Sequence, residues 1–128
     1  MHDALANQKF HLFTGKGGTG KTTLSAAAAV YYAEHSKKTL VASIDPAHSL
    51  SDCFGVDLGS EPIPITKNLF GVEIDAKKAL KRNRFSLKYI QDILKKLGIH
   101  DTDILETLPG IDELMAYDML VEFIEKRN

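Results

Sequence analysis

The residues with the clearest chemical meaning lie in a glycine-rich run near the N-terminus. The eight residues from Gly15 to Thr22 read GKGGTGKT and match the pattern G-x-x-x-x-G-K-[ST]. Glycines let successive backbone N–H groups turn toward one point without a Cβ in the way, which creates a nest for anionic oxygens. A helix that begins directly after such a loop adds its own unpaired N–H groups. The run therefore predicts a site for phosphate groups.

Each polar residue of this run has a separate predicted task. Lys21 supplies a full positive charge to the β- and γ-phosphates of a nucleotide, and the hydroxyl of Thr22 is placed for Mg²⁺. The alternative is a glycine-rich hairpin turn with incidental lysines, against which the expected strand–loop–helix setting argues. The predicted nucleotide-binding residues are Gly15, Lys16, Gly17, Gly18, Thr19, Gly20, Lys21, Thr22 and Thr23.

A carboxylate follows the second apolar segment of the chain. Asp45 ends the run TLVASID and precedes Pro46. In α/β proteins, ligand chemistry lies at the carboxyl ends of strands, where a carboxylate can orient or deprotonate the water that attacks a γ-phosphate. The alternative is that Asp45 caps a short helix expected near residues 49–54, a task that Ser49 can also perform. We predict Asp45 as a catalytic residue and residues 45–54 as a switch segment.

The elements that must position these residues alternate along the chain. The predicted strands are residues 9–14 (KFHLFT), 39–45 and 69–74, and the predicted helices are residues 20–36, 76–97 and 111–126. Alanine-rich composition supports the first helix, apolar residues at helical spacing support the other two, and Gly98 supplies a stop for the second helix. Strand–helix–strand order with short connections is typical of a parallel β-sheet with flanking helices. We therefore predict a single α/β domain over residues 1–128.

Composition limits the classes of protein that this chain can represent. Its 128 residues are 44% hydrophobic and 26% charged with a net charge of −1, which is ordinary for a globular domain and argues against nucleic-acid binding. The single cysteine, Cys53, excludes an internal disulfide and a cysteine-built metal site. His11 and His48 have no second ligand at useful spacing, so they are predicted to be structural. The N-terminal residues lack a basic-then-apolar leader, so we expect a cytoplasmic protein.

Two longer segments carry a resemblance to a known family. The chain resembles the arsenical-pump ATPase family and its tail-anchored-protein-targeting branch in four places. These are FTGKGGTGKTTLSAAAAVYY, SIDPAHSLSDCFG, EID at 73–75 and PGIDEL from residue 109. The members of this family are P-loop ATPases of the deviant Walker A class. The resemblance implies a homodimer that binds Mg·ATP, in which Lys16 reaches across the dimer to the partner's nucleotide and Asp45 activates water. It also implies a membrane-protein client or a membrane pump as partner, and the alternative for Lys16 is a solvated loop lysine.

The sequence departs from that family in two respects. The family's second switch (D-T-A-P-T-G-H) and its adenine-contacting regions do not occur in these residues, so we expect a truncated, N-terminal portion whose nucleotide binding is weak and whose turnover is close to nil. The pump branch has a metalloid-binding cysteine where this chain has Gly110, which argues against arsenite binding. Three alternative functions stay open: an inactive nucleotide- or phosphate-binding fragment, a partition-type positioning ATPase and a small-molecule kinase. The run DPAHSLSD argues against the partition-type ATPase.

Two features of the second half have competing interpretations. A basic stretch over residues 77–88 is interpreted as a solvated helix face, with an acidic receptor tail or a membrane surface as the alternative. The apolar stripes of residues 80–97 and 111–124 are interpreted as core. In the targeting branch, helices of this region help to form a groove for a client's transmembrane helix, which is the alternative that the resemblance implies.

Overall fold

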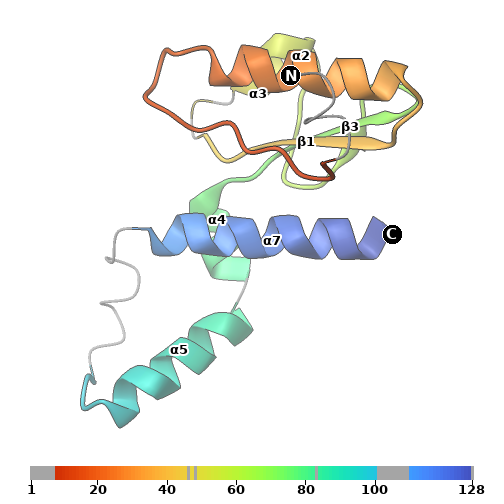
Figure 1. The fold of residues 1–128 in the computed structure, drawn as a ribbon. Coiled ribbons are helices and arrows are strands. Elements are labelled where there is room, and N and C mark those ends of the chain that lie inside the picture. The colour runs from red at the N-terminus through yellow and green to blue at the C-terminus, as the bar shows by residue number, and fades with distance from the viewer. Residues whose placement is uncertain (1–7, 46, 48, 83, 101–109, 128) are drawn as a thin grey trace.

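The computed structural model describes residues 8–45, 47, 49–82, 84–100 and 110–127. Its elements in chain order are α2 (Lys21–Glu34), β1 (Thr39–Ser43), α3 (Ser49–Phe54), β2 (Ile63–Pro64), β3 (Leu69–Glu73), α4 (Ala76–Arg82), α5 (Arg84–Lys96) and α7 (Ile111–Arg127). Figure 1 shows a small sheet with α2 and α3 on one face and α4 with α7 on the other, while α5 extends away from the sheet. The α/β class predicted from the sequence is the class observed.

The alanine-rich helix α2 lies directly on the sheet. Ala26, Ala29 and Ala33 are buried, and their small side chains let the helix approach β1 and β3 closely. Buried side chains from the sheet, from α3 and from the following loop complete this layer of the core: Val41, Leu50, Leu58 and Leu69. The sequence prediction of a helix over residues 20–36 is confirmed, with its first helical residue at Lys21.

The sheet has the order β1-β3-β2 among the described residues. β1 and β3 are parallel, with Thr39 opposite Leu69 and Ser43 opposite Glu73, so two of the three predicted strands are confirmed. β2 is a two-residue strand that pairs antiparallel with β3 and was not predicted. Pro64 is compatible with its place at the sheet edge, because proline cannot donate to a second ladder. The sheet is therefore mixed rather than wholly parallel.

The second layer of the core joins β3, α4 and α7. Val72, Ile74, Ala79, Met115, Ala116, Met119 and Phe123 are buried together. The predicted helix over residues 76–97 is two helices, α4 and α5, and Gly98 follows α5 at φ +81°, a conformation that suits its role as a stop. The core interpretation of the 111–124 stripe is correct for Met115 and Phe123, whereas Leu114 and Ile124 are exposed.

The strand predicted at residues 9–14 is wrong. This segment pairs with none of the three described strands, and Phe10 and Leu12 are more than half exposed. A strand needs a neighbour about 4.8 Å away. Residues 8–13 and β1 both line one cavity, but no backbone pairing joins them. The apolar and aromatic composition of residues 9–14 is typical of a strand, but composition does not show whether a pairing partner is present.

Among the described residues, no helix combines the length and the apolar character that crossing a bilayer requires.

Candidate functional site

The glycine run forms an open loop between the N-terminal segment and α2. Gly15, Gly18 and Gly20 have φ values of +150°, +77° and +85°, which other residues adopt only with strain. A Cβ placed on Gly17, Gly18 or Gly20 would meet no atom within 4 Å. The glycines at positions 18 and 20 are therefore explained by the left-handed backbone and not by crowding around the loop.

Two side chains of the loop converge on one main-chain oxygen. The ammonium of Lys21 and the hydroxyl of Thr19 each donate a hydrogen bond of 2.7 Å to the carbonyl of Lys16. These contacts fold Lys21 back over its own loop and fix the loop's curvature. The side chain of Lys16 itself is exposed to solvent.

The N-terminus of α2 has no cap from the protein's side chains. Gly20 occupies the N-cap position and makes no side-chain hydrogen bond there, and no acidic residue lies in the first turn. The first intrahelical bond runs from the N–H of Leu24 to the oxygen of Gly20, which leaves the N–H groups of Lys21, Thr22 and Thr23 outside the helical ladder. An uncapped helix start with this polarity favours an anion such as phosphate.

Asp45 follows the carboxyl end of β1 and faces the same region. Its Oδ1 accepts the N–H of Ala47 at 3.0 Å, and its own N–H donates to Ser43 Oγ at 3.2 Å. Those bonds form a local turn and fix the carboxylate's orientation. The alternative in which Asp45 caps α3 finds no support, because Asp45 Oδ1 accepts the N–H of Ala47 instead.

The second residue expected as a cap, Ser49, has a different role. His48, which was predicted to be structural, lies outside the described residues, and Ser49 is the first residue of α3. Its Oγ lies 3.2 Å from Thr22 Oγ1 on α2. The sequence did not indicate this contact, since the two residues are 27 positions apart.

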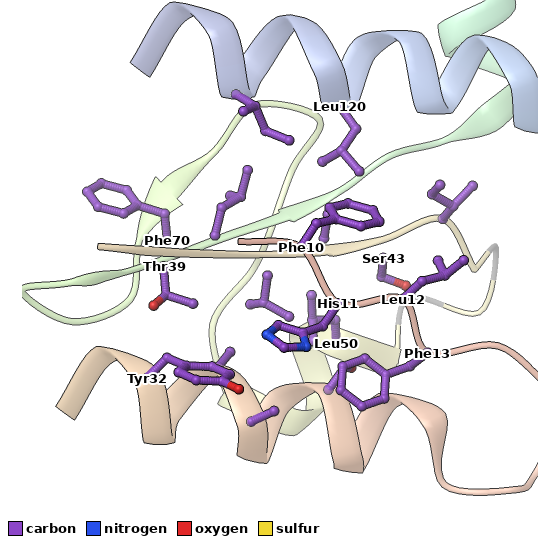
Figure 2. Close-up of a pocket in the computed structure, with 18 of the residues that line it drawn as sticks. Phe10, His11, Leu12, Phe13, Tyr32, Thr39, Ser43, Leu50, Phe70 and Leu120 are labelled. Atoms are coloured by element: carbon purple, nitrogen blue, oxygen red, sulfur yellow. The ribbon is translucent and has the colours of Figure 1, made fainter. Parts of the chain in front are cut away.

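A cavity of about 1020 Å³ reaches three of the predicted site residues, whereas residues 15–20 and Thr23 are not among the residues that line it. Lys21, Thr22 and Asp45 line it together, so the structure brings the predicted phosphate, metal and water-activating groups to one space. The rest of the lining mixes apolar with polar residues and comes largely from the 8–13 segment, β1, α2 and α7, as Figure 2 shows with Phe10, Leu12, Phe13 and Leu120 around the cavity. His11 stacks on Tyr32 at 5.1 Å between ring centroids, in agreement with its predicted structural role.

The donor groups present fit a magnesium ion that arrives with a nucleotide. The described residues contain no group of three or more histidines, cysteines or carboxylates that could hold a metal without help. Mg²⁺ commonly keeps several waters and takes one or two protein oxygens together with phosphate oxygens. The half-buried Thr22 hydroxyl, which follows the glycine loop directly, provides one such oxygen.

The features peripheral to the cavity have simpler descriptions. Lys77, Lys78 and Lys88 of the basic stretch are exposed, as a solvated face requires. Cys53 is a free, exposed cysteine on α3. Gly110 adopts φ +87° and accepts the N–H of Leu114 as α7 begins, so a left-handed backbone explains glycine at this position.

A glycine loop that opens a helix and an aspartate that follows a neighbouring strand are typical of the P-loop NTPases. The strand that precedes the loop in that arrangement is not formed by residues 8–14. Residues 8–128 match the family model described as anion-transporting ATPase, and the chain belongs to that family. Its members include proteins named as ATPases, and the family resemblance stated from the sequence is confirmed.

Individual relatives agree with this assignment. The chain is 47% identical over 107 residues to a protein of Chlorobaculum tepidum provisionally named an arsenical pump-driving ATPase, covering 81% of the chain and 26% of that protein. It is 34% identical over 132 residues to ATPase ASNA1 homolog 1 of Paramecium tetraurelia, covering 98% and 40%. It is 34% identical over 138 residues to ATPase GET3B of Arabidopsis thaliana, covering 92% and 34%. The chain thus spans less than half the length of each relative.

Proposed function

We propose that this protein is a P-loop ATPase that binds Mg·ATP and cleaves the bond between its β- and γ-phosphates, acting as a homodimer coupled to a membrane-related partner. The observation that carries the proposal is that Lys21, Thr22 and Asp45 line one cavity at the start of α2 and the end of β1. Membership of a family whose members are named as ATPases supports the choice of reaction. The same membership disfavours the partition-type and small-molecule-kinase alternatives.

The residues divide the reaction among them. The backbone N–H groups of the loop and the ammonium of Lys21 bind the phosphates, and Thr22 gives its oxygen to Mg²⁺. Asp45 accepts a proton from, or orients, the water that attacks the γ-phosphorus. The bond from that phosphorus to the β–γ bridging oxygen breaks, and ADP and phosphate leave. The bond from Ala47 to Asp45 holds the carboxylate ready without consuming both of its oxygens.

Lys16 is proposed to act across a dimer. Its carbonyl accepts hydrogen bonds from Lys21 and Thr19, while its side chain is exposed to solvent. A cation supplied by a neighbouring subunit stabilises charge on the transferring phosphoryl group in the manner of an arginine finger. The proposal therefore links nucleotide binding to association of two copies.

The proposed partner follows from the relatives. One relative is named as pump-driving and another as GET3B, which supports anion export or tail-anchored-protein targeting in the cytoplasm. Gly110 and the single exposed Cys53 favour the second of these, because one thiol is a poor site for arsenite.

A binding titration tests the nucleotide part of the proposal. A fluorescent ATP analogue is added to the chain with Mg²⁺, and ATP, GTP and inorganic phosphate are used as competitors. We expect saturable binding that ATP displaces at lower concentration than phosphate does. Displacement by phosphate at the same concentration as ATP would instead assign a passive phosphate site. Turnover that disappears in Asp45→Asn supports the assigned role of that carboxylate and contradicts the expectation that turnover by these 128 residues is close to nil.

Sedimentation tests the dimer. The chain with Mg²⁺ and a non-hydrolysable ATP analogue is expected to sediment as a dimer, and Lys16→Ala is expected to stay monomeric while it still binds the analogue. Lys95→Ala, which removes an exposed cation from α5, is the matched control. A dimer of equal stability in Lys16→Ala would overturn the role of Lys16 but not the role of the loop.

A further inference from the structure

The short helix α3 is held at both of its serines by other elements. On one side, the N–H of Ser51 donates to Oε1 of Glu73 at 2.8 Å, and Glu73 stands at the end of β3. On the other side, Ser49 Oγ lies 3.2 Å from Thr22 Oγ1. α3 therefore bridges the end of a core strand and the residue that is proposed to bind Mg²⁺.

Glu73 is unusual in its surroundings. It is 4% exposed and is the buried charged residue among the described residues, whose other buried side chains are hydrophobic. A buried carboxylate must be hydrogen-bonded, because an unsatisfied buried charge is strongly destabilising. Ser51 is the third residue of α3, so its N–H lacks a partner within the helix and is a suitable donor. The negative charge also lies at the helix end that favours it.

Neighbouring contacts make this connection stiff. The N–H of Glu73 donates to the oxygen of Gly59 at 3.0 Å, which fixes the strand end that carries the carboxylate. Ser51 Oγ accepts the N–H of Leu58 at 3.1 Å. Leu50, between the two serines, is 1% exposed and packs in the core beneath α2. α3 has little freedom to slide without losing these contacts.

The contact between the two hydroxyls has a consequence for metal binding. A hydroxyl that gives a lone pair to a cation still carries a proton, which must point to an acceptor. Partners of this kind orient metal ligands and contribute to metal affinity. Ser49 Oγ lies 3.2 Å from Thr22 Oγ1, and since either hydroxyl can be the donor, Ser49 is able to accept the Thr22 proton.

We propose that Glu73 is a positioning residue of the site: by holding Ser51 it fixes α3 so that Ser49 accepts the Thr22 proton when Thr22 binds Mg²⁺. The inference rests on the proposed function. It assigns to residues outside the glycine loop the part of nucleotide affinity that depends on the metal. The same four-residue connection, from Glu73 through Ser51 and Ser49 to Thr22, links β3 to the occupancy of the loop.

The affinity of the chain for ATP is measured with Mg²⁺ and again in EDTA, and the ratio of the two values is compared among variants. Ser49→Ala removes the acceptor, and Glu73→Met removes the carboxylate at similar length. Each variant is expected to lower the ratio of the affinity in Mg²⁺ to the affinity in EDTA about fivefold, which corresponds to the free energy of one hydrogen bond. The affinity in EDTA is expected to stay unchanged. Glu73→Gln, which keeps an acceptor oxygen, is expected to retain most of the ratio, and the exposed Ser60→Ala is the control.

Hydrogen exchange on the ligand-free chain gives a second readout. The Ser51 amide is expected to exchange about fivefold faster in Glu73→Met than in the wild type or in Glu73→Gln. If Glu73→Met does not fold, Glu73→Asp, which withdraws the carboxylate by one methylene, replaces it. Equal ratios in all variants, or equal loss of binding with and without Mg²⁺, overturn the inference alone. A wild-type chain that binds no ATP overturns the proposed function as well.

Discussion

The ammonium nitrogen of Lys21 lies 2.7 Å from the main-chain oxygen of Lys16, five residues earlier in the same loop. The loop thus supplies its own acceptor for the charge that is meant for a phosphate. A phosphate oxygen carries negative charge and is a stronger acceptor for an ammonium group than a neutral carbonyl. Replacement of the Lys16 carbonyl by a phosphate oxygen as the acceptor of the Lys21 ammonium is therefore favourable. Before a phosphate binds, the Lys21 side chain is already held against the loop and does not extend into solvent.

Lys21→Ala is expected to weaken ATP binding without unfolding the chain. A hydrogen bond from a charged group contributes about 1.5–3 kcal/mol, which corresponds to a loss of affinity of roughly 10- to 150-fold. The ammonium's present bond is solvent-exposed, so its removal changes stability little. Binding is measured by titration and stability by urea unfolding, with Lys95→Ala as the control. An unchanged dissociation constant contradicts the assignment of Lys21.

Two adjacent glycines of the loop differ in backbone conformation, and this gives a matched pair. Gly18 has φ +77°, whereas Gly17 lies outside the left-handed region, and a Cβ at either position meets no atom within 4 Å. Gly18→Ala is therefore expected to destabilise the fold by roughly 1–2 kcal/mol through backbone strain. Gly17→Ala should change the free energy of unfolding by less than about 0.5 kcal/mol. Urea unfolding that shows equal effects for the two variants argues against the left-handed loop.

The sequence predicted those features that depend on local pattern. The glycine loop, the alanine-rich helix and the position of Asp45 follow from residue types over short spans, and the helix and the two core strands are confirmed. The roles of the loop residues and Asp45 in nucleotide chemistry stay predictions.

The errors arose where long-range contacts decide the structure. Residues 9–14 have strand-like composition, but pairing needs a neighbour, and composition does not reveal where that neighbour is. The link from Thr22 through Ser49 to Glu73 was also missed, because it joins residues from three separate segments. A single signal was available: Glu73 is a carboxylate at a strand position flanked by apolar residues, which is costly unless a partner exists.

Shortening a buried side chain of α7 is expected to weaken the packing of this helix against β3 and α4. Phe123 is 4% exposed and packs with β3 and α4, whereas Val121 is 51% exposed. Phe123→Ala should destabilise the chain by about 3–5 kcal/mol, because a large cavity remains after the ring is removed. Val121→Ala is the control and should change stability by less than about 1 kcal/mol. Thermal and urea unfolding measure both, and similar losses for the two variants mean that α7 does not pack as described.

Gly71 on β3 is expected to tolerate no larger residue, for reasons of space and not of backbone conformation. A Cβ at this position would lie 2.6 Å from Ile65 Cδ1 and 3.0 Å from Leu58 Cδ2, and Gly71 has no positive φ. Both neighbours are ends of flexible side chains, so they can move at a cost, and overpacking of this kind destabilises by about 1–3 kcal/mol.

Gly59 provides the comparison, because a Cβ there meets nothing within 4 Å. Gly71→Ala should therefore lower the urea midpoint clearly, and Gly59→Ala should leave it nearly unchanged. The double variant Gly71→Ala with Ile65→Val removes the methyl group that lies nearest to the new Cβ, and it is expected to recover part of the loss. If the second substitution only adds to the damage, the crowding around Gly71 comes from other atoms, and the close approach of the 58–65 loop to β3 is wrong.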